Sequence, residues 1–69
     1  MKPRERIRKA AILALQEGGS PRLARKVLEA PEALPWQDLE RRFQALLETV
    51  PDDEARWRVA RYAWGKEEG

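Results

Sequence analysis

Apolar residues recur at helical spacing in four segments of the chain, and proline or glycine separates each segment from the next. No segment alternates apolar and polar residues as a half-buried strand does. The clearest repeat has alternating intervals of three and four residues: Trp36, Leu39, Phe43, Leu46 and Val50. Two heptads are too few for a long coiled coil, so this pattern favours a helix within a bundle. The sequence predicts an all-α fold, a compact bundle of four short helices over about residues 4–17, 21–30, 36–49 and 52–64.

Residues with known preferences for helix ends flank these segments. Gly18 can adopt the left-handed conformation that ends the first helix. Ser20 can cap free N–H groups of the second helix, and Pro21 suits its first position. Pro51 and the acidic residues 52–54 open the last helix, since negative charge complements the N-terminal end of the helix dipole.

The first helix has an apolar side made mostly of alanine. The residues predicted to be buried there are Ile7, Ala10, Ala11, Ala14 and Leu15. Because alanine is short, a neighbouring helix can approach this side closely.

The last helix is apolar over more of its circumference than packing on one side requires. At 100° per residue, an arc of about 220° is covered by Ala55, Trp57, Val59, Ala60, Tyr62, Ala63 and Trp64. A second surface must therefore cover this helix. We expect a protein interface at Trp57, Ala60, Tyr62 and Trp64, since Trp, Tyr and Arg are enriched in interfaces. Burial in the core, or stacking of bases on aromatics interleaved with arginines, are the alternatives.

The chain has 69 residues, of which 42% are hydrophobic and 38% charged, as expected for one globular domain over residues 1–69. We expect residues 65–69 to form a frayed tail. So small a domain buries little surface on folding, which makes self-association an expected source of stability. Arg outnumbers Lys ten to four and Asn is absent, a composition resembling that of thermophile proteins.

The residues that most often perform catalysis or bind metals are missing. The sequence has no Cys and no His, and Ser20 and Thr49 lie at helix ends without a base to activate them. The acidic run 52–54 already has a reason to be there at a helix start. We expect neither an enzyme nor a bound cofactor or metal.

Charge is segregated along the chain. Residues 1–26 carry eight basic and two acidic side chains, whereas residues 27–54 carry two basic and eight acidic ones. The two halves can neutralise each other in the fold, with acids such as Glu32 or Asp38 beside the basic N-terminal end. The other interpretation is a surface for nucleic acid or an acidic partner, with the first two helices arranged as a helix-turn-helix. The residues of that surface are Lys2, Arg4, Arg6, Arg8, Lys9, Arg22, Arg25 and Lys26.

The longest apolar run, residues 10–15, is far shorter than the roughly 20 residues that cross a bilayer, so we expect a cytoplasmic protein that does not insert into membranes. The sequence as a whole predicts a helical protein-interaction module without catalytic activity that associates with itself through the last helix. Another protein as the partner remains open, and nucleic-acid binding through the basic N-terminal half is the alternative.

Overall fold

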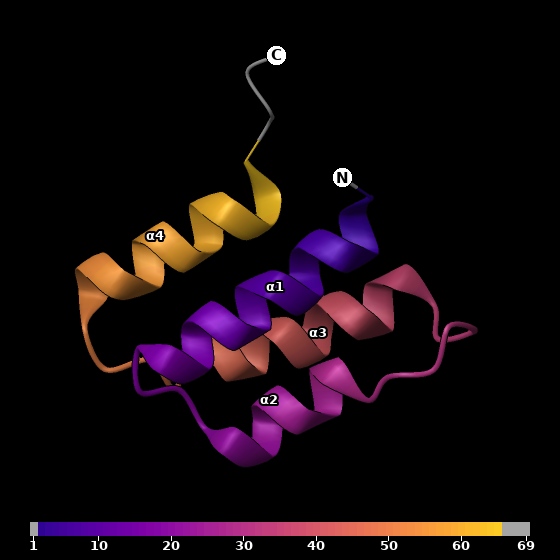
Figure 1. Cartoon of the computed structure of the whole chain (residues 1–69), viewed down its shortest axis with the longest axis horizontal. Coiled ribbons are helices and arrows are strands. Elements are labelled where there is room, and N and C mark those ends of the chain that lie inside the picture. Colours follow the sequence, from indigo (N-terminus) through magenta and orange to yellow (C-terminus); the bar gives the residue numbers. More distant parts are fainter. Residues whose placement is uncertain (1, 66–69) are drawn as a thin grey trace.

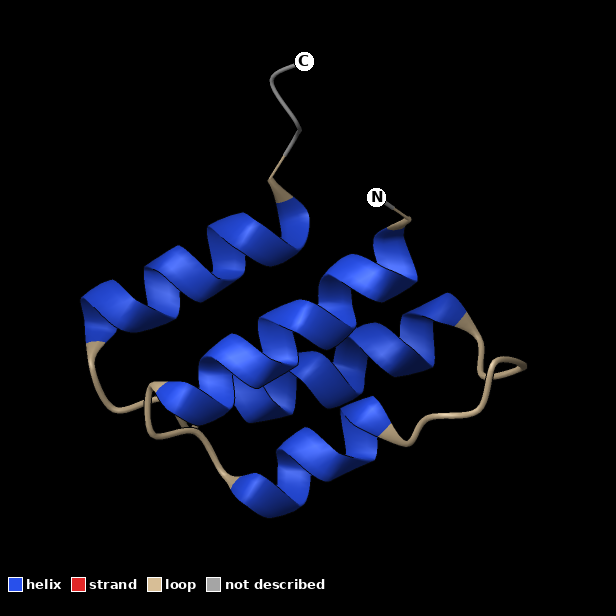
Figure 2. Cartoon of the chain, in the orientation of Figure 1, coloured by secondary structure: helices blue, strands red, loops and turns tan. Residues whose placement is uncertain are grey.

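Four helices pack together in the computed structural model, which describes residues 2–65 (Figure 1). They are α1 (Pro3–Gln16), α2 (Pro21–Leu28), α3 (Trp36–Leu47) and α4 (Asp53–Trp64). Short loops join them, and the described residues contain no strand (Figure 2). The predicted all-α bundle is confirmed.

Two helices end earlier than the sequence predicts. α2 ends at Leu28 rather than near residue 30, and α3 ends at Leu47 rather than near residue 49. For α2 the physical reason is Pro31, which disfavours helical geometry in the residue before it. Beyond Gly65, the predicted tail lies outside the described residues.

α1 is the central element, since it contacts each of the other three helices. In Figure 1 it runs in front of α3, with α2 and α4 on either side. Its fully buried residues are Ile7, Ala10, Ala11 and Ala14. Leu15 is a correction: predicted to be buried, it is 38% exposed, because it lies at the edge of the alanine side where no helix covers it.

The larger core side chains come mainly from α3. Its Leu39, Phe43 and Leu46 are buried in one cluster with the alanines of α1, and Val50 joins them from the following turn. The molecule is a thin slab of 33 × 32 × 16 Å. A slab of this thickness holds one layer of core side chains, so the outer sides of its helices stay exposed.

The turn between α1 and α2 depends on two glycines. Gly18 has φ +91°, the left-handed conformation predicted for it. The N–H of Gly19 donates to the carbonyl of Ala14 over 2.8 Å. A Cβ atom on Gly19 would lie 2.8 Å from that oxygen and 3.2 Å from Leu46. The sequence Gly18–Gly19 is thus required by backbone geometry and by the close approach of the core.

Side-chain caps form at two of the predicted helix starts. Ser20 Oγ accepts from the N–H of Leu23 at 3.4 Å, and the N–H of Ser20 donates to Thr49 Oγ1 at 2.8 Å. The second bond joins the start of α2 to the end of α3. At α4, the carboxylate of Asp52 accepts from the N–H of Ala55 at 2.9 Å.

Gly19→Ala should lower the free energy of unfolding by about 1–3 kcal/mol, because the added methyl group must displace a backbone carbonyl or a core leucine. Urea unfolding followed by circular dichroism measures the change. Ala45→Ser, on the exposed side of α3, is the control and should change stability by no more than about 0.5 kcal/mol. Equal stabilities of the two variants would contradict the close packing at Gly19.

Candidate protein interface

The residues of α4 that are buried against the rest of the molecule are all small. Ala55, Val59 and Ala63 recur every four residues and are buried. They occupy about 80° of the wide apolar arc. The aromatic residues of α4 therefore lie at the edges of the contact with the core or outside it.

Two tryptophans stand on the outer side of α4. Trp57 is 67% exposed and Trp64 is 38% exposed, and Ala60 lies between them in the sequence. Together with Arg61 and Gly65 they line a hollow of about 280 Å³. We call Trp57, Ala60, Arg61 and Trp64 the outer face of α4. Three of the four predicted interface residues belong to it.

Trp64 is held in place by α3. Its ring meets that of Phe43 edge to face, with centroids 5.2 Å apart at 79°. Its Nε1–H donates to Glu40 Oε2 at 3.1 Å. Trp57 has no hydrogen bond or ring contact within residues 2–65. One tryptophan thus forms a fixed wall of the hollow, and the other projects into solvent.

Tyr62, the fourth predicted interface residue, lies away from this face. It is half-buried against the core, and the guanidinium carbon of Arg6 is 5.4 Å from the centroid of its ring. Tyr62 therefore joins α4 to α1 and does not line the hollow.

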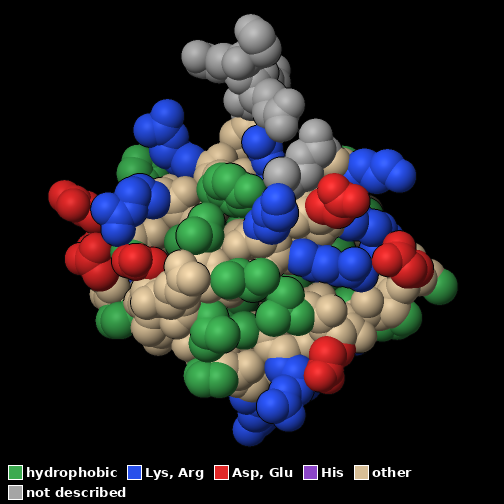
Figure 3. Space-filling view, viewed as in Figure 1, with side chains coloured by type: hydrophobic (Ala, Val, Ile, Leu, Met, Phe, Trp, Pro, Cys, Tyr) green, Lys and Arg blue, Asp and Glu red, His purple; other side chains and the backbone are tan. Residues whose placement is uncertain are grey.

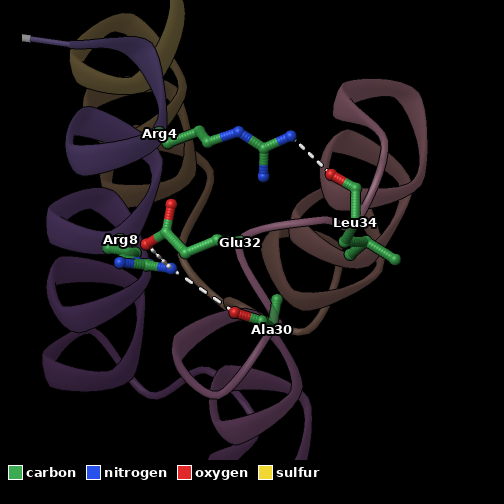
Figure 4. A network of polar contacts seen from close by, with 5 residues as sticks. All are labelled: Arg4, Arg8, Ala30, Glu32 and Leu34. Carbon is green, nitrogen blue, oxygen red and sulfur yellow. Dashed lines mark hydrogen bonds and ion pairs between the residues drawn. The ribbon is translucent and has the colours of Figure 1, made fainter.

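The arginines at the start of α1 turn back onto the fold. Arg4 donates to the carbonyl of Leu34, and Arg8 donates to that of Ala30 at 3.4 Å (Figure 4). Arg8 also forms an ion pair with Glu32 at 3.4 Å. These bonds attach the connector between α2 and α3 to α1. The predicted neutralisation by Glu32 is present.

Arg6 reaches the residue that follows α4, where it donates to the carbonyl of Gly65 at 2.6 Å. Asp38, the second predicted acidic partner, instead lies 3.8 Å from Arg41 of its own helix. The basic N-terminal end is thus used largely within the fold rather than extended as an arm.

The remaining predicted basic residues are exposed. Arg22, Arg25 and Lys26 lie on the solvent side of α2, where Arg25 is 3.9 Å from Glu29. Lys2, just before α1, and Lys9, within it, are also exposed. The structure therefore separates the eight basic residues into three that bind other parts of the chain and five on the surface.

A larger hollow, of about 750 Å³, lies beside the start of α1. The residues that line it are Lys2, Pro3, Arg4, Glu5, Arg8, Glu32 and Trp36. Its three cations face two acids, and two of the cations already bind connector carbonyls. Its charge is therefore largely balanced by its own lining.

A second exposed apolar surface, not predicted from the sequence, lies on α1. Ile12, Leu13 and Leu15 are 44%, 36% and 38% exposed. Figure 3 shows apolar side chains gathered on the face where α1 and α2 lie. The signal was present, since Ile12 and Leu13 fall outside the alanine side of the helix.

Within residues 2–65, no group of three or more His, Cys, Asp or Glu side chains is arranged to hold a metal ion. None of the described helices has the length and apolarity needed to cross a membrane. Comparison of the chain with protein families, with curated proteins and with solved structures finds no match.

The two tryptophans should differ in what they contribute to stability. Trp64→Ala removes a ring contact and a hydrogen bond and should lower the free energy of unfolding by about 1–3 kcal/mol. Trp57→Ala should change it by no more than about 0.5 kcal/mol. Urea unfolding at low protein concentration, where association does not contribute, measures both values. A larger loss from Trp57→Ala would place that residue in the core.

Proposed function

We propose that this chain is a small helical protein-interaction module that associates with itself through the outer face of α4. The observation that carries the proposal is Trp57, the most exposed large apolar side chain of the described residues, beside a hollow with a fixed tryptophan wall. Covering large apolar side chains releases about 1.5–3 kcal/mol each, which is substantial beside the stability of so small a domain.

The geometry of the hollow supports binding rather than further folding. Trp64 is already fixed by Phe43 and Glu40, so a partner does not have to immobilise it. A preorganised wall lowers the entropic cost of association. Trp57, in contrast, projects into solvent as a large side chain of the kind that dominates interface energetics.

The solution mass tests this function. Light scattering at about 0.1 M and about 1 M salt, a range over which the screening length falls about threefold, should give a dimer or larger species at both. The apolar contact accounts for assembly at high salt. Trp57→Ala should give a monomer with the same far-ultraviolet circular dichroism.

Ile12→Ala is the matched control, because it removes an exposed apolar side chain from α1 instead. It should leave the mass unchanged. A wild-type monomer throughout the concentration range would overturn self-association, and dissociation by Ile12→Ala alone would move the interface to α1.

Nucleic-acid binding is the second candidate, favoured by the exposed Arg22, Arg25 and Lys26 on one short helix. If these three cations contact phosphates, affinity for duplex DNA should fall about 40-fold between 50 and 200 mM salt. Replacing all three with Gln should abolish that binding. Fluorescence anisotropy with a labelled duplex measures both effects, and affinity that ignores salt would exclude this candidate.

A further inference from the structure

The solvent side of α4 carries an acidic residue, Glu54, in addition to Arg61 of the outer face. Glu54 and Arg61 are seven residues apart, so at 100° per residue they lie within about 20° of one another, two turns apart along the helix. Trp57 lies between them along the axis and about 40° from Arg61 around it. From its N-terminal to its C-terminal end, the face therefore reads acid, tryptophan, base.

In the described part of the chain these two charges lack partners, unlike their neighbours on the same helix. Asp53 is 3.0 Å from Arg56, and Arg58 is 3.3 Å from Glu17. Glu54 and Arg61 are exposed, and neither side chain has a hydrogen bond or an ion pair within residues 2–65. Both charges are thus available beside the exposed tryptophan.

We propose that the partner at this face is a second copy of the chain, packed with its α4 antiparallel to the first about a twofold axis near Trp57. The inference rests on the proposed function and specifies its geometry. A twofold axis midway between Glu54 and Arg61 places Glu54 of each copy opposite Arg61 of the other. The surface is then complementary to itself in charge.

The same axis brings the two Trp57 side chains together. The point midway between Glu54 and Arg61 lies half a residue beyond Trp57. At a rise of about 1.5 Å per residue, this is less than about 1 Å along the helix axis. Indole rings placed there can pack in an offset or edge-to-face arrangement. A parallel pair would instead place Glu54 against Glu54 and Arg61 against Arg61, so the charges select the antiparallel orientation.

The size of the face sets the expected strength. α4 has 12 residues, about 18 Å of helix. A standard specific interface takes about 600 Å² or more from each partner, roughly an eighth of this molecule's 4957 Å². A single helix face is at the lower limit of that range, so we expect a dissociation constant in the micromolar range. In such an interface charge fixes orientation more than affinity.

Charge reversal tests the pairing. Glu54→Arg and Arg61→Glu each place like charges opposite one another, and each should weaken the homodimer by about tenfold or more at 0.1 M salt. Mixing the two variants should restore dimers, as heterodimers, and combining both changes in one chain should restore the homodimer. Sedimentation velocity over a concentration series measures these dissociation constants.

Glu48→Arg is the control for Glu54→Arg, because it makes the same change in net charge at an exposed position at the end of α3. It should leave the dissociation constant unchanged. Circular dichroism melts confirm that each variant is folded, which matters for Glu54→Arg because it removes an acid from the first turn of α4.

The outcomes separate the two proposals. A monomeric wild-type protein overturns self-association itself. A wild-type dimer that Trp57→Ala dissociates, but that neither charge reversal weakens, leaves the outer face of α4 as the interface and overturns the antiparallel pairing. Variants that dissociate alone and fail to form heterodimers when mixed also overturn the pairing.

Discussion

The alanine side of α1 is the contact on which the other three helices depend. Ala10, Ala11 and Ala14 have no exposed surface, and α2, α3 and α4 all contact this one helix. Short side chains let the helices approach closely, and the largest buried side chain, Phe43, comes from α3 instead. The consequence is a thin molecule with a shallow core. Large apolar side chains on the outer sides of its helices have nowhere to be buried.

That shallow core makes polar contacts between distant segments more important. Arg4 and Arg8 bind carbonyls of the connector between α2 and α3, and Arg6 binds the carbonyl of Gly65. Long arginine side chains also cover apolar surface with their methylene groups. Positive charges at the N-terminal end of α1 are unfavourable for the dipole of that helix, but these arginines attach the connector and the end of α4 to it.

The candidate interface follows from the same geometry. The buried residues of α4 are small, so its tryptophans lie at the edge of the contact with the core or outside it. Trp64 reaches back to Phe43 and Glu40, whereas Trp57 does not. A fixed ring beside a projecting one, with an acid and a base on the same face, is a surface suited to a partner of matching shape and charge.

The sequence by itself determined the local features: the four helices, the left-handed turn at Gly18, the cap at Ser20 and the acidic start of α4. These depend on residues within a turn or two of one another. It also showed that α4 is apolar over too wide an arc to be buried on one side, and Trp57 is indeed the most exposed large apolar side chain of the described residues.

Only the tertiary structure decided how that arc is divided and where the arginines bind. Tyr62 contacts Arg6 of α1, and Trp64 contacts α3, because of the side on which α4 packs against the other helices. Leu15 is exposed for the same kind of reason, since helical spacing gives the direction of a side chain but not whether another helix lies there. Helix positions follow from packing between segments far apart in the chain, which periodicity within one segment does not encode.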